Sequence, residues 1–420
     1  MTRREFLGAP VAAMAALDPE VRMVESTGEA RRWWPRWRGP TGQGLAIGSG
    51  YPDQWSDTDK RANIRWKVEL PGTGNSSPVI WEDRIFLTAS HDGGARRVML
   101  CLRRTDGKLL WETPASPAEA ERSNRKNGHA SATPSTDGQR VYTYFGNHGL
   151  VAVDMGGRLV WHQSFGVLDA YHGTACSPLL YRDRVVVYQD HRGSAGSFVA
   201  AFDSRTGKKI WRTDRAERVG WGSPVAILAG AREEIIVSSY RRVYAYHPDS
   251  GAELWRCEGN LVEVIPTPVA GHGLLFCCSG RAGPTLAIRP GGSGDVTATR
   301  IVWQTPKGSP FVPSPLLYGD YLYLVNDMTA VATCFEARTG KLAWQERLAE
   351  ARRESFSSSP VAVDGKVFIT SDDGETSVLA AGSKFKLAGT NRLGSRVLAS
   401  PALVEGRWFW RTATHLVCVG

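Results

Sequence analysis

A short phrase recurs along the chain at regular intervals. It consists of a small residue, a glycine six positions later and a tryptophan four positions after that, as in Ala201, Gly207 and Trp211. Further copies contain Cys101, Gly107 and Trp111; Ala245, Gly251 and Trp255; Cys334, Gly340 and Trp344; and a version one residue shorter with Ala152, Gly157 and Trp161. Because self-similarity at a fixed period identifies repeat architectures, this phrase constrains the fold before any single residue can indicate chemistry.

A second marker gives the same period. A hydroxyl residue followed by proline opens each unit, just before an apolar run, at Ser77-Pro78, Thr133-Pro134, Ser177-Pro178, Ser223-Pro224, Thr267-Pro268, Ser314-Pro315, Ser359-Pro360 and Ser400-Pro401. Successive markers are 41 to 56 residues apart. Within a unit, apolar runs separated by Asp-Gly and similar turns predict hairpins. A pitch of this length with four short strands is typical of a propeller blade, and the marker predicts eight of them.

The two ends of the chain predict how the ring closes. The eighth unit begins at Ser400 and reaches Gly420 after three expected strands, while residues 64–70 contain a further strand with Trp66. We therefore expect an all-β fold, an eight-bladed propeller of four-stranded antiparallel blades, in which the N-terminal strand completes the C-terminal blade. In blade seven the corresponding stretch, residues 385–388, offers no tryptophan, so we expect the inter-blade seam of this blade to be the weakest.

The tryptophans and glycines of the phrase have an expected structural role. A large ring buries about 150–250 Å², and a glycine permits both the turn and the close approach of a neighbouring blade. The residues predicted to dock blades together are Trp66, Trp111, Trp161, Trp211, Trp255, Trp303, Trp344, Gly107, Gly157, Gly207, Gly251 and Gly340.

These motifs resemble a known family. The phrase is similar to the tryptophan-docking motif of quinoprotein dehydrogenases, a WD40-like kind of repeat. The segment Trp34-Pro35-Arg36-Trp37-Arg38, with Ser76-Ser77-Pro78, resembles bacterial PQQ-like β-propeller repeat proteins, which are related in fold to the outer-membrane assembly factor BamB. The resemblance implies the eight-bladed fold. It implies function only indirectly, because functional sites vary on a common fold.

The N-terminus predicts export. Residues 2–7 match the twin-arginine consensus, and residues 8–17 are apolar but too short to span a bilayer. We expect residues 1–30 to be an export signal and tail, cleaved after Ala15 or near Ala30, residues 31–63 to be a leader that packs on the propeller, and residues 64–420 to be one propeller. The protein would then be periplasmic or secreted, a monomer, and without a transmembrane segment after signal removal.

The seven cysteines do not predict a disulfide framework. Cys101, Cys334 and Cys418 occupy the small-residue position of the phrase, where they are expected to be buried spacers in separate blades. Cys277 and Cys278 resemble the vicinal disulfide of PQQ-dependent alcohol dehydrogenases, but in a strand their side chains should point to opposite faces. No spacing typical of a haem or zinc site is present.

Candidate binding residues lie in the loops expected to converge at one mouth of the channel. They are Arg125, Asn127, His129, Asn147, His172, Asp190, Trp221, Arg242, Arg281, Asp327 and Asp372. Arg125, Arg242 and Arg281 could bind an anion such as quinone carboxylates, while Asp190, Asp327 and Asp372 could supply oxygen ligands to calcium. Neither set forms a recognised motif, and no catalytic or metal-ligating residue is assigned.

Three function classes follow from these residues. The first is an exported, non-enzymatic propeller that binds a protein, peptide or polysaccharide partner in the cell envelope, with no cofactor. The alternative is an oxidoreductase that uses PQQ and calcium. A carbohydrate-active or lyase-type propeller, using residues near Tyr171 and His172, is the third. The formal net charge of +9 favours anionic partners, but no basic helix or aromatic–arginine patch indicates nucleic acid.

Overall fold

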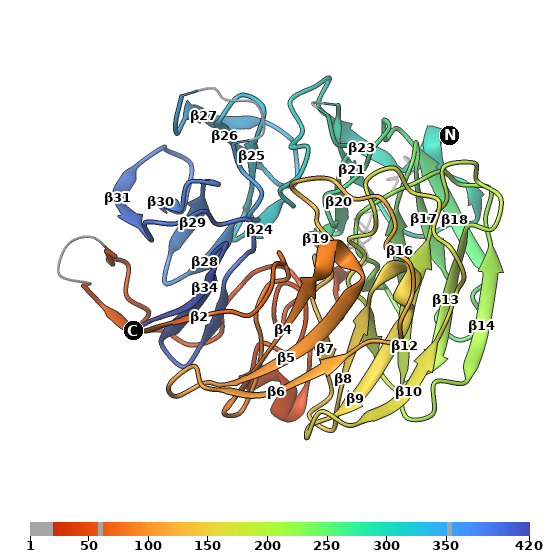
Figure 1. Cartoon of the computed structure of the whole chain (residues 1–420). Coiled ribbons are helices and arrows are strands. Elements are labelled where there is room, and N and C mark those ends of the chain that lie inside the picture. The colour runs from red at the N-terminus through yellow and green to blue at the C-terminus, as the bar shows by residue number, and fades with distance from the viewer. Residues whose placement is uncertain (1–19, 58–61, 282, 351–354) are drawn as a thin grey trace, which may run out of the picture.

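Eight twisted sheets surround a central channel in the computed structural model, which describes residues 20–57, 62–281, 283–350 and 355–420 (Figure 1). Each sheet contains a meander of four antiparallel strands. Helices in these ranges are short: α1 (Thr297–Arg300) and the 3-10 turns η1 (Gly28–Arg32), η2 (Asp92–Gly94) and η3 (Gly146–His148). The all-β class and the eight four-stranded blades are confirmed.

The strands follow the order expected from the repeats. Blade one contains β3 (Val79–Trp81), β4 (Arg84–His91), β5 (Arg96–Arg103) and β6 (Leu109–Pro114). Blade two contains β7 (Ser135–Thr136), β8 (Arg140–Tyr144), β9 (Leu150–Asp154) and β10 (Leu159–Gln163). Blade three contains β11 (Leu179–Tyr181), β12 (Arg184–Gln189), β13 (Phe198–Asp203) and β14 (Lys209–Asp214). Blade four contains β15 (Val225–Ala229), β16 (Arg232–Ser238), β17 (Arg242–Tyr246) and β18 (Glu253–Glu258).

The second half repeats this arrangement. Blade five contains β19 (Val269–Gly271), β20 (Leu274–Cys278), β21 (Thr285–Ile288) and β23 (Ile301–Gln304). Blade six contains β24 (Leu316–Tyr318), β25 (Tyr321–Asn326), β26 (Val331–Glu336) and β27 (Leu342–Arg347). Blade seven contains β28 (Val361–Val363), β29 (Lys366–Thr370), β30 (Glu375–Ala380) and β31 (Leu387–Arg392). Blade eight contains β32 (Ala402–Val404), β33 (Arg407–Arg411), β34 (His415–Val419) and, as its outer strand, β2 (Ile64–Glu69).

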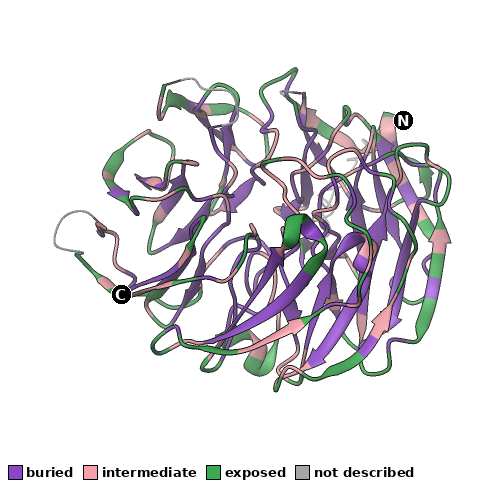
Figure 2. Ribbon diagram, viewed as in Figure 1, coloured by how far each residue is buried: buried purple, intermediate pink, exposed green. Residues whose placement is uncertain are grey.

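Burial follows the position of a strand in its blade. The middle strands are buried on both faces, as in β12, whereas outer strands such as β14 expose most of their residues (Figure 2). The blades therefore share buried faces with their neighbours, as a propeller requires.

Blade four carries two additional strands. The short strand β1 (Val21–Met23) pairs antiparallel with the inner strand β15, and β22 (Gly294–Asp295) pairs parallel with the outer strand β18. Residues 20–30 were assigned from the sequence to the export tail, yet Val21–Met23 belong to a sheet. The proposed twin-arginine residues lie outside the described ranges.

The register explains why each phrase begins with a small residue. In seven blades this residue lies directly opposite the tryptophan of the outer strand, as Ala201 does opposite Trp211. The other pairs are Cys418 and Trp66, Cys101 and Trp111, Ala152 and Trp161, Ala245 and Trp255, Ala287 and Trp303, and Cys334 and Trp344. Because opposite side chains in a ladder are close neighbours, a small one leaves room for the indole.

The cysteines are buried and unbonded. All seven are free thiols. Cys277 packs into the core cluster with Trp255, whereas Cys278 packs with Phe276 and Leu317, so the two side chains point to opposite faces of β20. Strand alternation accounts for this separation.

Tryptophans of outer strands contact the turn of the following blade. The Trp111 indole donates to the Met155 carbonyl oxygen at 3.1 Å, and a Cβ atom at Gly157 would lie 2.7 Å from its ring. Equivalent indole contacts join Trp161 to Ser204, Trp211 to Pro248, Trp303 to Ala337 and Trp344 to Gly382. Trp66 packs beside Gly107. Trp255 differs, because its indole donates to Glu234 within blade four at 2.8 Å.

The seam between blades seven and eight is filled by the N-terminal segment, residues 20–57. Trp55 lies 6.2 Å from Phe368 of blade seven and 5.3 Å from Trp408 of blade eight, measured between ring centroids. Its backbone N–H donates to the Asn391 side chain at 2.9 Å. An indole from outside the repeats therefore occupies the seam that the sequence marks as lacking one.

The N-terminal segment also crosses the inner edges of several blades. Trp34 forms a β-bridge with Ile80 of blade one, and Leu45 forms one with Ala362 of blade seven. Between them, the Gln43 side chain accepts a hydrogen bond from Ala270 of blade five at 3.1 Å. The segment thus spans one end of the central channel.

Candidate functional site: a funnel at the channel mouth

The hydroxyl residues that open the repeats form a hydrogen-bonded ring in the channel. The backbone N–H of each donates to the hydroxyl of the next blade over 2.9–3.2 Å, and seven such bonds run from Ser77 through Thr133, Ser177, Ser223, Thr267, Ser314 and Ser359 to Ser400. Of the eight hydroxyls in this ring, only that of Ser77 has no hydrogen-bond partner among the described residues.

A second ring lies two residues earlier in each repeat. Because side chains two positions apart in extended chain point the same way, these residues also face the channel. They are Asn75, Ser131, Ala175, Trp221, Ile265, Val312, Ser357 and Leu398. With the hydroxyl ring they enclose a space of about 110 Å³, which Trp37 of the N-terminal segment also lines. The Trp37 indole donates to the Thr267 hydroxyl at 3.3 Å. This indole therefore forms part of the wall at the narrow end of the channel, which has the shape of a funnel.

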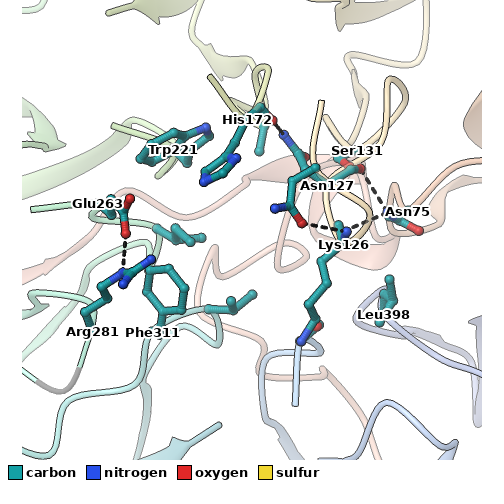
Figure 3. A pocket seen from close by; sticks show the side chains of 15 residues that line it. Asn75, Lys126, Asn127, Ser131, His172, Trp221, Glu263, Arg281, Phe311 and Leu398 are labelled. Carbon is teal, nitrogen blue, oxygen red and sulfur yellow. Dashed lines mark hydrogen bonds and ion pairs between the residues drawn. The ribbon is translucent and has the colours of Figure 1, made fainter. Parts of the chain in front are cut away.

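The wider end of the funnel is a cavity of about 290 Å³, here called the mouth. Figure 3 shows Glu263, Arg281 and Phe311 on one side of an open space, and Asn75, Asn127, Ser131 and Lys126 across it. Trp221, Ile265, Val312, Phe311 and Leu398 make much of the wall apolar.

An aromatic cluster forms one side of the mouth. Trp221 is 5% exposed, and its indole donates to the Gly173 carbonyl oxygen at 2.8 Å. Its ring centroid lies 5.3 Å from that of Tyr171 and 5.8 Å from that of His172. Because the indole is held by both a hydrogen bond and ring contacts, Trp221 presents a fixed apolar surface to the mouth.

The charged side chains at the mouth are paired. Glu263 forms an ion pair with Arg281 and accepts a hydrogen bond from the Tyr171 hydroxyl at 3.0 Å, and Arg281 lies 5.2 Å over the Phe311 ring. Burial, followed by the Glu263 charge, raises the pKa of Tyr171 well above its usual range. Lys126 Nζ lies 2.9 Å from Asp372 Oδ2. Burial raises the pKa of Asp372, and Lys126 opposes that shift.

Two asparagines hold the loops of the opposite side together. The Asn75 amide donates to the carbonyl oxygens of Lys126 and Asn127 at 3.0 and 2.9 Å. The Asn127 amide in turn donates to the carbonyl oxygens of His172 and Thr174 at 2.7 and 3.1 Å. These bonds connect the loops before blades one, two and three, so the shape of the mouth depends on side-chain amides.

The structure brings only some of the predicted residues to the mouth. Asn127, His172, Trp221 and Arg281 line it. Arg125 and His129 line a second hollow beside it, of about 310 Å³.

The remaining predicted residues hold other parts of the fold. Asn147 braces a loop by donating to Glu119 and accepting from Leu168. Arg242 pairs with Glu258 at 2.7 Å. Asp190 is buried between blades three and four, where it accepts a hydrogen bond from Ser239 at 2.8 Å and pairs with Arg215 at 3.2 Å.

The three acidic residues considered for calcium are not grouped around one point in the described ranges. Asp190 faces Arg215, whereas Asp372 faces Lys126. Asp327 is fully buried behind the mouth, accepts a hydrogen bond from the Phe311 backbone at 2.8 Å, and has its pKa raised to about 6 by burial. In the described ranges no three His, Cys, Asp or Glu side chains are grouped to hold a metal ion. The predicted calcium ligands therefore do not fit one ion.

The three arginines considered for an anion are also apart. Arg281 lines the mouth and Arg125 the second hollow, while Arg242 lines neither.

Several residues of the mouth were not singled out from the sequence. They are Asn75, Lys126, Ser131, Glu263, Phe311 and Leu398. A signal was available for Asn75, Ser131 and Leu398, because each lies two positions before the hydroxyl that opens a repeat. Glu263 and Phe311 occupy neither of the two positions that form the rings, so the repeats do not identify them.

The fold and site define the protein as an eight-bladed propeller with a funnel-shaped cavity on its axis. The chain belongs to the family described as outer membrane protein assembly factor BamB, whose model matches residues 21–166, 95–345 and 328–419. A search of curated proteins found no match. No helix in the described part of the chain is long and apolar enough to cross a membrane.

Solved structures share this fold at low sequence identity. BamB from Moraxella catarrhalis is 13% identical with a TM-score of 0.61, covering 84% of this chain and 96% of that one. The quinohemoprotein alcohol dehydrogenase from Comamonas testosteroni is 12% identical with a TM-score of 0.66, covering 93% and 81%. A europium-containing methanol dehydrogenase is 10% identical with a TM-score of 0.64, covering 93% and 89%. BamB and the two dehydrogenases therefore share this fold.

Proposed function

We propose that the protein is an exported, non-enzymatic propeller of the cell envelope that binds a protein, peptide or polysaccharide partner at the mouth. The observation that carries this proposal is the chemistry of the mouth wall. Its charged side chains Lys126, Glu263 and Arg281 already have partners inside the protein. Much of the remaining wall consists of Trp221, Ile265, Val312, Phe311 and Leu398, which suits a partner's apolar groups.

The titratable groups support a binding role over catalysis. A catalytic acid or base must reach the reacting atoms. Asp327 has the raised pKa often found at active sites, but it is fully buried and does not line the mouth. Tyr171 is held by Glu263 in a hydrogen bond that opposes loss of its proton. The family description, an outer membrane assembly factor, and the twin-arginine sequence support a place in the envelope.

An oxidoreductase that uses PQQ and calcium is the second candidate. It is favoured by the likeness to the two dehydrogenase structures, which shows the shared fold. The three carboxylates proposed as calcium ligands, however, do not form one group in the described ranges, and Asp190 and Asp372 face Arg215 and Lys126.

Binding to peptide and glycan arrays, followed by titration of the selected ligand, tests the first proposal. Trp221→Ala removes the fixed ring of the mouth, and we expect the affinity of the selected ligand to fall at least about tenfold, which is typical of an aromatic anchor. Leu159→Ser is the control, because Leu159 is 56% exposed on the outer strand β10, away from the mouth. Equal affinity of both variants and the unaltered protein would remove the mouth as the binding site.

A parallel titration with PQQ and Ca²⁺ separates the two candidates. Stoichiometric quinone binding with dye-linked alcohol oxidation would overturn the non-enzymatic proposal. Absence of quinone binding at micromolar concentration would remove the oxidoreductase.

A further inference from the structure

The second hollow is strongly basic. It lies beside the mouth, with which it shares Asn75, Asn124 and Leu398, and its volume is about 310 Å³. Three arginines, Arg125, Arg396 and Arg411, and one histidine line it, and none of its lining residues is Asp or Glu.

Arg411 is the unusual member of this set. It ends strand β33 of blade eight and is 2% exposed. Its Nη1 donates to the Ser76 hydroxyl at 2.8 Å and to the Thr88 carbonyl oxygen at 2.7 Å, while its Nε has no hydrogen-bond partner among the described residues. Burial lowers the pKa of Arg411 to about 9, and no carboxylate raises it.

A buried cation without a counterion is costly, by several kcal/mol in typical proteins, and its removal from water is usually offset by a paired charge. Two of the three other arginines that are buried in the described ranges have one: Arg97 pairs with Glu121 at 2.6 Å and Arg215 with Asp190 at 3.2 Å. The third, Arg38, donates to the carbonyl oxygens of Gln43 and Pro360 instead. Arg411 instead borders an open hollow that can admit an anion. Gly74 leaves room for the guanidinium, because a Cβ atom there would lie 2.6 Å from Arg411 Nη2.

We propose that the second hollow binds a small anion bearing a phosphate or carboxylate group, with Arg411 at its base and Arg125 and Arg396 at its rim. Guanidinium groups match the oxygen geometry of both anions and form charge-assisted hydrogen bonds with them. Arg125 and Arg396 are exposed at the entrance, and the charge of Arg396 also acts on the neighbouring Asp372 carboxylate. His129 is a wall residue, since its Nε2 is held at 2.9 Å by the Glu121 carbonyl oxygen.

The test is isothermal titration of the full chain at low ionic strength with inorganic phosphate and, separately, with succinate. We expect one anion per protein, and the tighter of the two identifies the preferred group. Arg411→Met and Arg396→Gln should each weaken binding by about ten- to a hundredfold, as loss of a charged hydrogen bond does.

Arg38→Met is the matched control. Arg38 is likewise buried with unpartnered guanidinium nitrogens, but it lies in the N-terminal segment and lines neither hollow. We expect this variant to bind the anion as the unaltered protein does. If Arg411→Met does not fold, the Arg396→Gln variant still tests the proposal, because Arg396 is exposed.

Failure to bind either anion at millimolar concentration would overturn the proposal, as would affinity that is unchanged in Arg396→Gln and Arg411→Met. Trp221→Ala should retain anion binding, so the result is independent of the partner proposed for the mouth.

Discussion

The backbone N–H of Ser314 donates a 2.9 Å hydrogen bond to the hydroxyl of Ser359 in the next blade. From the sequence, the hydroxyl-proline pair marks the start of a repeat. In the structure it also links adjacent blades, because each hydroxyl accepts the N–H of its neighbour around most of the channel.

Ser359→Ala should destabilise the protein by about 1–3 kcal/mol, because the buried Ser314 N–H loses its acceptor. Ser77→Ala is the matched control, since the Ser77 hydroxyl is buried without a partner among the described residues. We expect it to cost less than about 0.5 kcal/mol. Urea unfolding followed by tryptophan fluorescence measures both, and equal losses would contradict a specific role for the ring of hydrogen bonds.

Gly251→Ala should destabilise the contact between blades three and four. Gly251 has φ +70°, and a Cβ atom there would collide with the Trp211 ring. Gly48 has φ +88° with nothing near its Cβ position, so Gly48→Ala reports the backbone strain alone. We expect Gly251→Ala to lower the free energy of unfolding by about 1–3 kcal/mol more than Gly48→Ala does, which is the typical cost of overpacking. Similar unfolding midpoints for the two variants would refute the packing role of the glycine.

Trp55→Ala should weaken the seam between blades seven and eight. Trp55 is 3% exposed and lies between Phe368 and Trp408. Truncation of such a ring typically costs about 3–5 kcal/mol. Leu387→Ala, at a half-exposed position of blade seven, should cost less than about 0.5 kcal/mol. Thermal unfolding monitored by circular dichroism distinguishes them. If Trp55→Ala lowered the unfolding temperature no more than Leu387→Ala does, the N-terminal segment would not support this seam.

Asp327→Asn should alter the dependence of stability on pH. Burial raises the pKa of Asp327 to about 6 in the folded protein, whereas an unfolded aspartate titrates near about 4. Between these values the folded state binds more protons, so its stability falls as pH rises from about 4 to about 6, by up to about 3 kcal/mol.

Asparagine keeps the acceptor for the Phe311 N–H without the charge. The variant should therefore lose the part of this fall that Asp327 contributes, while Asp190, whose pKa burial also raises to about 6, keeps its own contribution. Urea unfolding at pH 4.5 and 7 measures the difference between the variant and the unaltered protein. If the free energy of unfolding changed between pH 4.5 and pH 7 by the same amount in the variant and in the unaltered protein, Asp327 would not titrate in this range.

The repeats made the fold and part of the site predictable. The spacing of Gly207 and Trp211 defined a blade locally, and strand alternation separated Cys277 from Cys278. Trp221, predicted from the sequence as a loop residue of the mouth, lines it. Loop residues were less predictable: Asp190 looked like a mouth residue but is buried beside Arg215, because a loop's direction depends on packing between blades.

The sequence by itself determined the number of blades and the strand order, since these follow from local patterns repeated along the chain. Only the tertiary structure decided which charges meet. Glu263 and Arg281 are from one blade's loops, but Lys126 and Asp372 lie far apart in the chain and are joined by an ion pair beside the mouth. It also decided that Trp55 fills the irregular seam and that Arg411 is left buried beside an open hollow, because burial and pairing depend on neighbours that ring closure brings together.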